Sequence, residues 1–252
     1  MNVSCAHFTG AGTRANNQDC VGFQVSDDRA CFVVSDGVGG AAGGELAARY
    51  AVDALLACWR ASQRPVAELA PACVGAANAA ILARQANDDS HRQMSATVVA
   101  LFLDRREATA QWVHVGDSRL YRFRRGALVD RTRDHSVTQQ LADAGFPANG
   151  VSAHFLHMAL GMQGPLAASE SGVHSLQDGD VFLLCTDGFW QLVPESTIEH
   201  RLRIVQSVDD WACLLEHEAS RHPGNQQSAD NYSALAVWIG CPENVTLVSV
   251  RP

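Results

Sequence analysis

The sequence lacks a surplus of basic residues. It contains 19 lysines and arginines against 27 aspartates and glutamates, so its formal net charge is −8. A protein that binds nucleic acid by neutralising its phosphates needs the opposite balance. We therefore expect no nucleic-acid partner.

We also recognise no export signal and no membrane-spanning run in the sequence. We find no apolar run close to the roughly 20 residues that cross a bilayer. Residues 1–7 do not combine a basic stretch with an apolar one, as a signal peptide does. The eight cysteines are scattered, with no C-x-x-C pair, which favours reduced core thiols. We expect a cytoplasmic protein that does not bind membranes.

What is present is the composition of a folded chain, with 47% hydrophobic and 18% charged residues. Short β-branched and apolar runs predict strands, many of them in consecutive pairs typical of hairpins. They lie at 6–9, 21–25, 30–35, 97–103, 110–115, 120–123, 181–186, 233–239 and 246–250. Periodicity predicts helices at 45–59, at about 71–85 with Pro71 in the first turn, and at 209–221. We expect one α+β domain over residues 1–252.

The stretch 134–171 fits this pattern least well. It contains a short helical pattern around Val137 and Leu141, and then many glycines and prolines. Such a segment is typical of an irregular surface excursion beside a site. We call residues 134–171 the flap.

Four aspartates stand at the ends of predicted buried strands: Asp36, Asp117, Asp187 and Asp230. A carboxylate at the rim of an apolar core is costly unless something positive meets it. Glycine follows Asp36 and Asp187, where the backbone can turn and expose a carbonyl oxygen. Oxygen ligands suit Mg²⁺ or Mn²⁺. The alternative for each Asp-Gly pair is a simple turn.

Seven ordered blocks of the sequence resemble the motifs of the metal-dependent serine/threonine protein phosphatases of the PP2C (PPM) family. The blocks are RANNQD at 14–19, SDGVGG at 35–40, SAT at 95–97, VGDSRLY at 115–121, DHS at 134–136, LCTDGFW at 184–190 and DN at 230–231. They cover nearly the whole chain, and the compact bacterial form is the closer match. The resemblance implies a four-layer α-β-β-α sandwich, with two antiparallel sheets flanked by helices and metals at one end.

The resemblance also implies roles for single residues. Asp36 resembles the carboxylate that bridges two metals, and the Gly37 carbonyl resembles a ligand of one of them. Asp187 and Asp230 resemble the other ligands, while Asp19 resembles a residue that holds the second metal or its water. Arg14 resembles the arginine that binds the substrate phosphate. Asp117 resembles a ligand of a more weakly held third metal, and the flap falls where relatives carry a mobile segment.

These roles imply hydrolysis of phosphoserine and phosphothreonine in proteins, with two Mn²⁺ or Mg²⁺ ions and a possible third. Two cations held about 4 Å apart reverse the repulsion between an acidic cleft and a phosphate and activate a bridging water for attack. Arg14 can hold two phosphoryl oxygens at once. We expect phosphorylated proteins and a cognate kinase as partners, and a monomer.

Two residues depart from the family pattern. Gln18 stands where some relatives have glutamate, and Val38 replaces the histidine thought to protonate the leaving group in the eukaryotic branch. Valine cannot donate a proton, so water or a flap residue must do so. These departures leave open a phosphoprotein-binding regulator with weak catalysis. A hydrolase for small phosphate esters is a further alternative.

Other patterns in the sequence have simpler explanations. Gly37, Val38 and Gly39 fit part of a dinucleotide-binding motif, but the expected second strand is missing after it. Cys58 and Arg64 have the C-x5-R spacing of cysteine phosphatases, yet Cys58 lies on the apolar side of a predicted helix. The sequence DGD at 178–180 is best explained as a turn.

Three histidines stay open to more than one interpretation. His154 and His157 could bind a transition metal, although a position on the surface or flap is favoured. His135, in the DHS block, could orient the flap, supply the missing proton or make a structural hydrogen bond.

Overall fold

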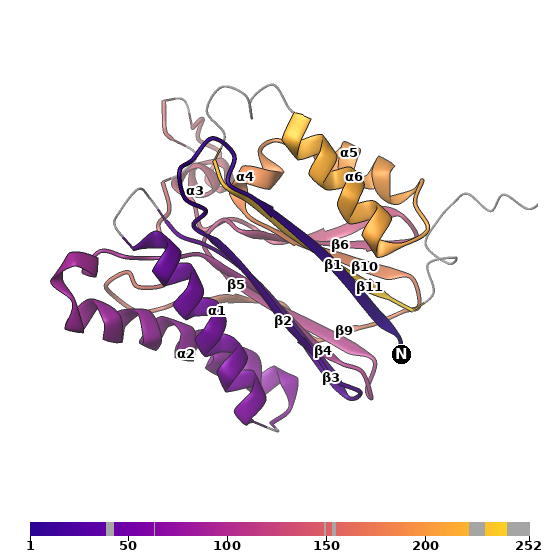
Figure 1. The fold of residues 1–252 in the computed structure, drawn as a ribbon, viewed down its shortest axis with the longest axis horizontal. Coiled ribbons are helices and arrows are strands. Elements are labelled where there is room, and N and C mark those ends of the chain that lie inside the picture. The colour runs from indigo at the N-terminus through magenta and orange to yellow at the C-terminus, as the bar shows by residue number, and fades with distance from the viewer. Residues whose placement is uncertain (39–42, 63, 149, 153–154, 222–229, 241–252) are drawn as a thin grey trace, which may run out of the picture.

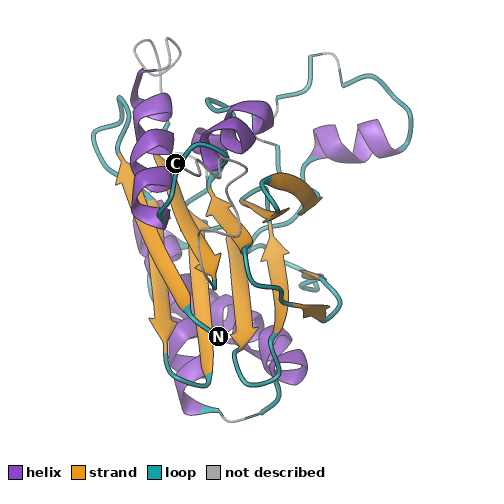
Figure 2. Ribbon diagram, turned by 90° about the vertical axis from the view of Figure 1, so that its right-hand side faces the viewer, coloured by secondary structure: helices purple, strands orange, loops and turns teal. Residues whose placement is uncertain are grey.

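Two antiparallel sheets pack face to face, with helices on both outer sides (Figure 1). The structure is a computed structural model and describes residues 1–38, 43–62, 64–148, 150–152, 155–221 and 230–240. The strand arrows in Figure 2 run alternately up and down, as antiparallel pairing requires.

The first sheet has the strand order β1-β11-β10-β6-β7. Its strands are β1 (Val3–Gly10), β6 (Arg119–Arg124), β7 (Ala127–Arg131), β10 (Asp180–Cys185) and β11 (Tyr232–Ile239). The two central strands, β10 and β11, are buried along their whole length. A strand covered on both faces reads as a continuous apolar run, which is why these two are visible in the sequence.

The second sheet has the order β2-β3-β4-β5-β8, with β9 also paired to β5. Its strands are β2 (Asp19–Val25), β3 (Arg29–Asp36), β4 (Val98–Asp104), β5 (Thr109–Val115), β8 (Ser169–Glu170) and β9 (His174–Ser175). Antiparallel neighbours joined by short turns place the start of β2 directly beside the end of β3. That pairing positions part of the site.

Helices cover the outer face of each sheet. Helices α1 (Gly44–Ala61) and α2 (Val66–Asn87) lie on the second sheet, whereas α5 (Glu195–Leu202) and α6 (Val208–Arg221) lie on the first (Figure 1). Two short helices, α3 (Val137–Asp143) and α4 (Asp187–Trp190), lie in connections. The 3-10 turn Asp89–His91 follows α2.

In the described part of the chain, three apolar clusters fill the spaces between the layers. One lies under α1 and α2, one lies under α5 and α6, and the third lies between the two sheets. In the third cluster, Phe32 and Val34 of one sheet meet Phe182 and Leu235 of the other, all fully buried. The predicted four-layer sandwich is confirmed.

Most predicted elements are confirmed within two residues at each end. The eight predicted strands that fall in described residues correspond to β1 to β6, β10 and β11, and the predicted strand 246–250 lies outside the described residues. The sequence missed β7, β8, β9, α4 and α5. Strands β8 and β9 have two residues each and exist only through pairing with β5, so no local pattern reveals them.

The predicted start of the second helix is wrong. Helix α2 begins at Val66, and Pro71 lies inside it instead of in its first turn. Proline removes one helical hydrogen bond and normally ends a helix. Here Leu69 and Ala70, which precede Pro71, are buried against the core, and their packing stabilises the extra turn.

Helix α2 also corrects our statement about apolar runs. By length and composition it is apolar enough to cross a membrane, with a mean hydropathy of 1.6. In the fold, however, 33% of that stretch is buried, and residues such as Cys73, Val74 and Ile81 pack in the cluster beneath α1 and α2. Much of the apolar character of α2 comes from alanine, so the run is not apparent when only large apolar residues are counted.

The described part of the flap leaves the first sheet after β7 and returns to the second sheet at β8. It contains α3, whose N-cap is Ser136; the Ser136 hydroxyl accepts a hydrogen bond from the Gln139 backbone amide. Two isolated bridges tie the segment down, between Ala96 and Leu160 and between Ser136 and Leu156. Its role as a mobile flap, like the single-domain assignment, stays a prediction.

Candidate metal centre

The predicted site residues lie at one end of the two packed sheets. Asp36 is the last residue of β3 and pairs in register with Asp19, the first residue of β2. Asp187 begins α4 just after β10, and Asp230 stands just before β11. Because neighbouring strands are antiparallel, the end of one strand and the start of the next lie at the same end of the sheet.

A cavity of about 250 Å³ opens at this edge. Its lining residues are Arg14, Gln18, Asp36, Gly37, Val38, Thr97, Asp117, Leu156, Asp187 and Asp230. Six of the seven predicted site residues are therefore brought together around one space. The seventh, Asp19, is not among the lining residues but is paired with Asp36 in the sheet.

The carboxylates of Asp36 and Asp19 are held in an environment that disfavours their charge. Burial, together with the charges of Asp19, Asp187 and Asp117, raises the pKa of Asp36 well above its usual range. Burial also raises the pKa of Asp19 to about 6, although a hydrogen bond from the Thr186 hydroxyl (2.9 Å) opposes the rise. Two neighbouring buried acids repel each other unless a proton or a cation lies between them.

One atom of this pair has no hydrogen-bond partner among the described residues. The Oδ1 oxygen of Asp19 is buried and accepts no hydrogen bond, and a buried polar atom without a partner is costly. Together with the four aspartates that line the cavity, this atom fits a hard divalent cation, which prefers oxygen ligands. Among the described residues, no three acidic, histidine or cysteine side chains already converge on one ion position. Small side-chain movements, the Gly37 carbonyl or water must complete a ligand set.

Both Asp-Gly pairs are explained by close backbone contacts. A Cβ atom on Gly188 would lie 2.1 Å from the carbonyl oxygen of Asn231, and one on Gly37 would lie 2.4 Å from the backbone of Gly44. Neither position therefore tolerates a side chain without displacing backbone. Glycine at 188 lets α4 approach the segment that carries Asp230, while glycine at 37 lets the end of β3 approach the start of α1.

Arg14 forms an ion pair that the sequence did not indicate. Its Nη2 atom lies 2.9 Å from Oδ2 of Asp230, and both side chains are partly exposed. Such exposed pairs contribute little, about 0–1 kcal/mol. The predicted phosphate-binding arginine and a predicted metal ligand thus neutralise each other, and a cation on Asp230 would free Arg14 for a phosphate.

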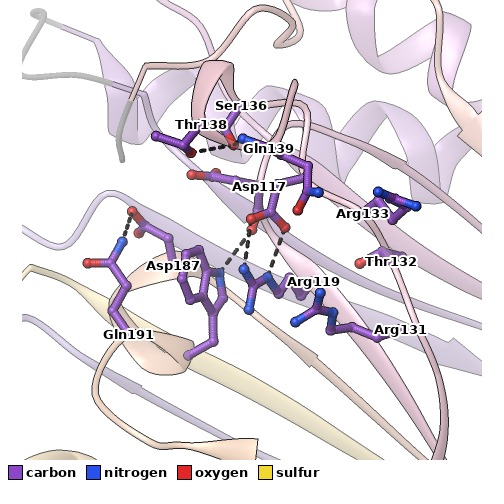
Figure 3. Close-up of polar contacts among 12 residues, drawn as sticks. Asp117, Arg119, Arg131, Thr132, Arg133, Ser136, Thr138, Gln139, Asp187 and Gln191 are labelled. Carbon is purple, nitrogen blue, oxygen red and sulfur yellow. Dashed lines mark hydrogen bonds and ion pairs between the residues drawn. The ribbon is translucent and has the colours of Figure 1, made fainter. Parts of the chain in front are cut away.

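Asp117 is buried at the turn between β5 and β6, next to a network of polar contacts (Figure 3). The Trp190 indole donates to the Asp117 carbonyl (3.0 Å), and the Arg119 guanidinium stacks 3.5 Å from the Trp190 ring. Arg119 also donates twice to Asp134, at 2.8 Å each. This network joins the turn that carries Asp117 to α4 and to the base of the flap.

Asp187 is held on the other side of the same network. Its Oδ2 atom accepts a hydrogen bond from the Gln191 amide at 3.0 Å (Figure 3). Gln191 lies one helical turn after Asp187, so the bond fixes the carboxylate locally at the edge of the cavity. One oxygen is thereby oriented by the protein before any ligand arrives.

His135 makes structural hydrogen bonds. Its Nδ1 accepts from the Gly116 amide (3.2 Å), so its Nε2 donates to the Ser169 hydroxyl (2.8 Å). Burial, with His114 and His157 nearby, lowers the pKa of His135 to about 4. Both ring nitrogens are engaged and the ring does not line the cavity, so the geometry favours the structural hydrogen bond among the three interpretations.

The remaining sequence patterns carry no chemistry in the described structure. Cys58 lies within α1 and packs against the apolar cluster, as predicted. Gly179 forms the predicted turn, and Asp180 is fully buried between Arg122 and Arg124. The ring of His157 lies tilted beside that of His135, with centroids 5.5 Å apart; His154 and Gly39 lie outside the described residues.

Three residues near the cavity escaped the sequence analysis as individuals. Thr97 accepts a hydrogen bond from the Asp36 amide through Oγ1 (3.0 Å), and Leu156 reaches the cavity from the flap. Asn231 is buried and binds the loop that carries Arg14. Thr97 and Asn231 both lie in the motif blocks given above. Each is a polar residue directly beside a buried strand, and that position could have marked it as a candidate site residue.

Comparison with known proteins agrees with this geometry. The profile of the family described as Protein phosphatase 2C matches residues 11–227. The serine/threonine phosphatase stp of Listeria monocytogenes serotype 4b (strain F2365) is 26% identical over 235 residues, which are 89% of this chain and 90% of that protein.

Solved structures show the same similarity. The serine/threonine phosphatase PstP/Ppp of Mycobacterium tuberculosis has a TM-score of 0.80 and 28% identity, covering 94% of this chain and 99% of that one. The catalytic domain of PstP in complex with two manganese ions has a TM-score of 0.78 and 29% identity, covering 94% and 98%. Since the family profile spans most of its length, the chain belongs to the protein phosphatase 2C family.

Proposed function

We propose that this protein is a metal-dependent phosphatase that hydrolyses phosphoserine and phosphothreonine in other proteins. The family assignment and the relatives named as serine/threonine phosphatases support this reaction. The observation that carries the proposal is the cavity, which the carboxylates of Asp36, Asp117, Asp187 and Asp230 line together with Arg14. An oxygen-rich site beside a guanidinium suits cations and a phosphate together.

The residues that would hold the cations are those at the edge of the sheets. Asp36 would be shared by two ions, with the Gly37 carbonyl, Asp187, Asp230 and Asp19 completing their ligands. Manganese is the ion supported by a relative, since PstP was solved with two of them. We propose that Mg²⁺ can replace it and that Asp117, buried at the far side of the cavity, serves a third ion.

Bound divalent cations generate a nucleophile from water at neutral pH and neutralise phosphoryl oxygens. The protein contributes orientation. Thr97 fixes the backbone of Asp36, and Gln191 fixes one oxygen of Asp187. Arg14 can donate two hydrogen bonds to a phosphate, which positions the phosphoryl group and stabilises the charge that develops on it. Since the reaction needs no covalent phosphoenzyme, no nucleophilic side chain is required.

The leaving group receives its proton from solvent water in this proposal. Val38 lines the cavity where a histidine stands in the eukaryotic branch, and valine has no proton to donate. Among the described residues that line the cavity, none carries an imidazole. The absence of a dedicated acid lowers the rate without changing the reaction.

We further propose that the substrates are phosphoproteins made by a cognate kinase and that the enzyme acts as a cytoplasmic monomer in signalling. The net charge of −8 disfavours binding to nucleic acid. Helix α2 is apolar enough to span a membrane, but its buried residues pack in the core of the fold, which supports a protein that does not bind membranes. The similarity to bacterial serine/threonine phosphatases supports phosphoprotein substrates.

The test is turnover of p-nitrophenyl phosphate and of a phosphothreonine peptide with Mn²⁺. We expect Asp36→Asn and Asp187→Asn to lose nearly all activity because each removes a charged ligand. Asp210→Asn, which changes an exposed aspartate on α6, is the matched control and should keep full activity. No turnover of either substrate with Mn²⁺ would overturn the proposal.

The same assays separate the alternatives. Tight binding of the phosphopeptide with almost no turnover identifies a phosphoprotein-binding regulator, which Gln18 and Val38 first suggested. Faster turnover of nucleotides or sugar phosphates than of the phosphopeptide identifies a hydrolase for small esters. Ordinary phosphopeptide turnover excludes both.

A further inference from the structure

Asn231 is a buried polar residue whose hydrogen-bonding groups all point to one loop. It stands between Asp230 and β11, with only 4% of its surface exposed. Its Oδ1 accepts from the Gln18 amide at 2.9 Å. Its Nδ2 donates to the carbonyls of Ala11 and Asn16, at 3.0 Å each. A carboxamide has two donor hydrogens and one acceptor oxygen, and here each is used.

The three partners span the connection between β1 and β2. This connection, residues 11–18, contains Arg14 midway between the anchor points at Ala11 and Asn16. Most of it is exposed. Besides the bonds to Asn231, its described contacts include a turn bond from the Arg14 amide to the Ala11 carbonyl (3.1 Å), a bond from the Gly37 amide to the Gln18 carbonyl (3.1 Å) and the ion pair of Arg14 with Asp230. Asn17 adds a side-chain bond to Thr9 at 2.7 Å. An exposed connection with few internal bonds needs an outside anchor to keep one conformation.

Asn231 is itself held rigidly against the rest of the site. The backbone carbonyl oxygen of Asn231 lies so close to Gly188 that a Cβ atom added to Gly188 would be 2.1 Å from it. The backbone amide of Asn231 donates a hydrogen bond to Oδ1 of Asp230 at 2.9 Å. One residue therefore connects α4, which carries Asp187, with Asp230 and with the loop that carries Arg14.

Few contacts of its own hold the Arg14 side chain in place. It is 57% exposed, and its side-chain hydrogen bond in the described structure goes to Asp230, which the proposed function assigns to a metal. Once Asp230 binds a cation, the placement of the guanidinium depends on the backbone of its loop. A small displacement of such a group is enough to reduce the rate strongly.

We propose that Asn231 is a positioning residue that sets the place of Arg14 for the substrate phosphate by clamping the loop 11–18. The inference rests on the proposed phosphatase function and on the phosphate-binding role of Arg14. It goes beyond them by assigning the loop's alignment to a single carboxamide that does not touch the substrate.

The test is a double-mutant cycle with Asn231→Ala and Arg14→Ala, measured with Mn²⁺ and p-nitrophenyl phosphate. We expect Asn231→Ala to lower kcat/KM by about 10- to 100-fold and to raise the inhibition constant of inorganic phosphate. In the Arg14→Ala background, the same substitution is expected to change kcat/KM by less than about threefold, since residues that act as a unit are not additive.

A matched control distinguishes positioning from loss of stability. Gln85 is also a buried carboxamide that donates to two loop carbonyls, those of Met94 (2.7 Å) and Gly161 (2.9 Å), but it does not contact loop 11–18. We expect Gln85→Ala to lower Tm as Asn231→Ala does, while its effect on kcat/KM stays the same with and without Arg14.

A second variant covers the case in which Asn231→Ala does not fold. Asn231→Asp keeps the oxygen that accepts from the Gln18 amide but removes the NH2 group that donates to the carbonyls of Ala11 and Asn16. We therefore expect the same loss of kcat/KM, and the same dependence of that loss on Arg14. Additive effects of Asn231 and Arg14 substitutions overturn the inference. So does an activity loss that disappears when Mn²⁺ is raised to saturation, because Asn231 would then act through the metal. If Arg14→Ala itself changes nothing, the proposed role of Arg14 fails instead.

Discussion

Replacing Asp19 by asparagine is expected to stabilise the metal-free protein at neutral pH. Burial raises the pKa of Asp19 from 3.8 to about 6, and the charge of Asp187 adds to the rise. A carboxyl group with a raised pKa binds its proton more tightly in the folded chain than in the unfolded one. Its contribution therefore favours the folded state below about pH 4 and is lost as the pH rises through about 6.

The magnitude follows from the size of the shift. A rise from 3.8 to about 6 corresponds to about 3 kcal/mol of lost stability at pH 7, since one pKa unit is about 1.4 kcal/mol. An asparagine has no charge to bury, can still accept from Thr186 and can donate to Asp36. We expect Asp19→Asn to recover about 1–3 kcal/mol, which raises Tm by on the order of 5 °C.

The assay is urea and thermal unfolding in EDTA at several pH values between 5 and 8. We expect the wild type to lose stability as the pH rises across this range and the variant to lose less. With excess Mn²⁺ the order is expected to reverse, because ligand binding stabilises the wild type more. A variant no more stable than wild type at pH 7 in EDTA would refute the reasoning. Asp210→Asn, on the exposed face of α6, is the control.

Two further predictions concern packing around the site. Gly188→Ala is expected to displace the backbone of Asn231, because the new Cβ would lie 2.1 Å from its carbonyl oxygen, and to lower both Tm and Mn²⁺-dependent activity; an unchanged Tm contradicts this. Arg119→Met is expected to cost about 3–5 kcal/mol, since it leaves Asp134 buried without its partner, whereas Arg106→Met at an exposed ion pair should cost less than about 1 kcal/mol. Urea unfolding compares the two, and equal costs would show that burial of the ion pair does not matter.

The fold could be predicted wherever one strand or helix carries its own pattern. Strands β3, β10 and β11 are buried on both faces and read as apolar runs, and α1 shows helical periodicity. Helix α2 was misplaced because proline is locally a stop signal, and only the buried Leu69 outweighs it. Local rules fail where packing supplies the free energy.

The candidate site could be predicted in composition but not in detail. The aspartates were visible because charge at the end of an apolar strand is unusual. The ion pair of Arg14 with Asp230 was not visible, since these residues are far apart in the sequence and meet only when β1 and β11 pair. The same pairing explains how Asn231 can bind the loop after β1.

The sequence by itself indicated the reaction class, because its ordered motif blocks resemble those of the PP2C family and its aspartates stand at the ends of predicted strands. Only the tertiary structure decided the electrostatics of the cavity. The raised pKa values of Asp36 and Asp19 and the unpartnered oxygen of Asp19 arise from burial and from neighbours on other strands. A charge costs little in the unfolded chain, where water surrounds it. It becomes a binding site for a cation only when folding removes the water and brings a second carboxylate beside it.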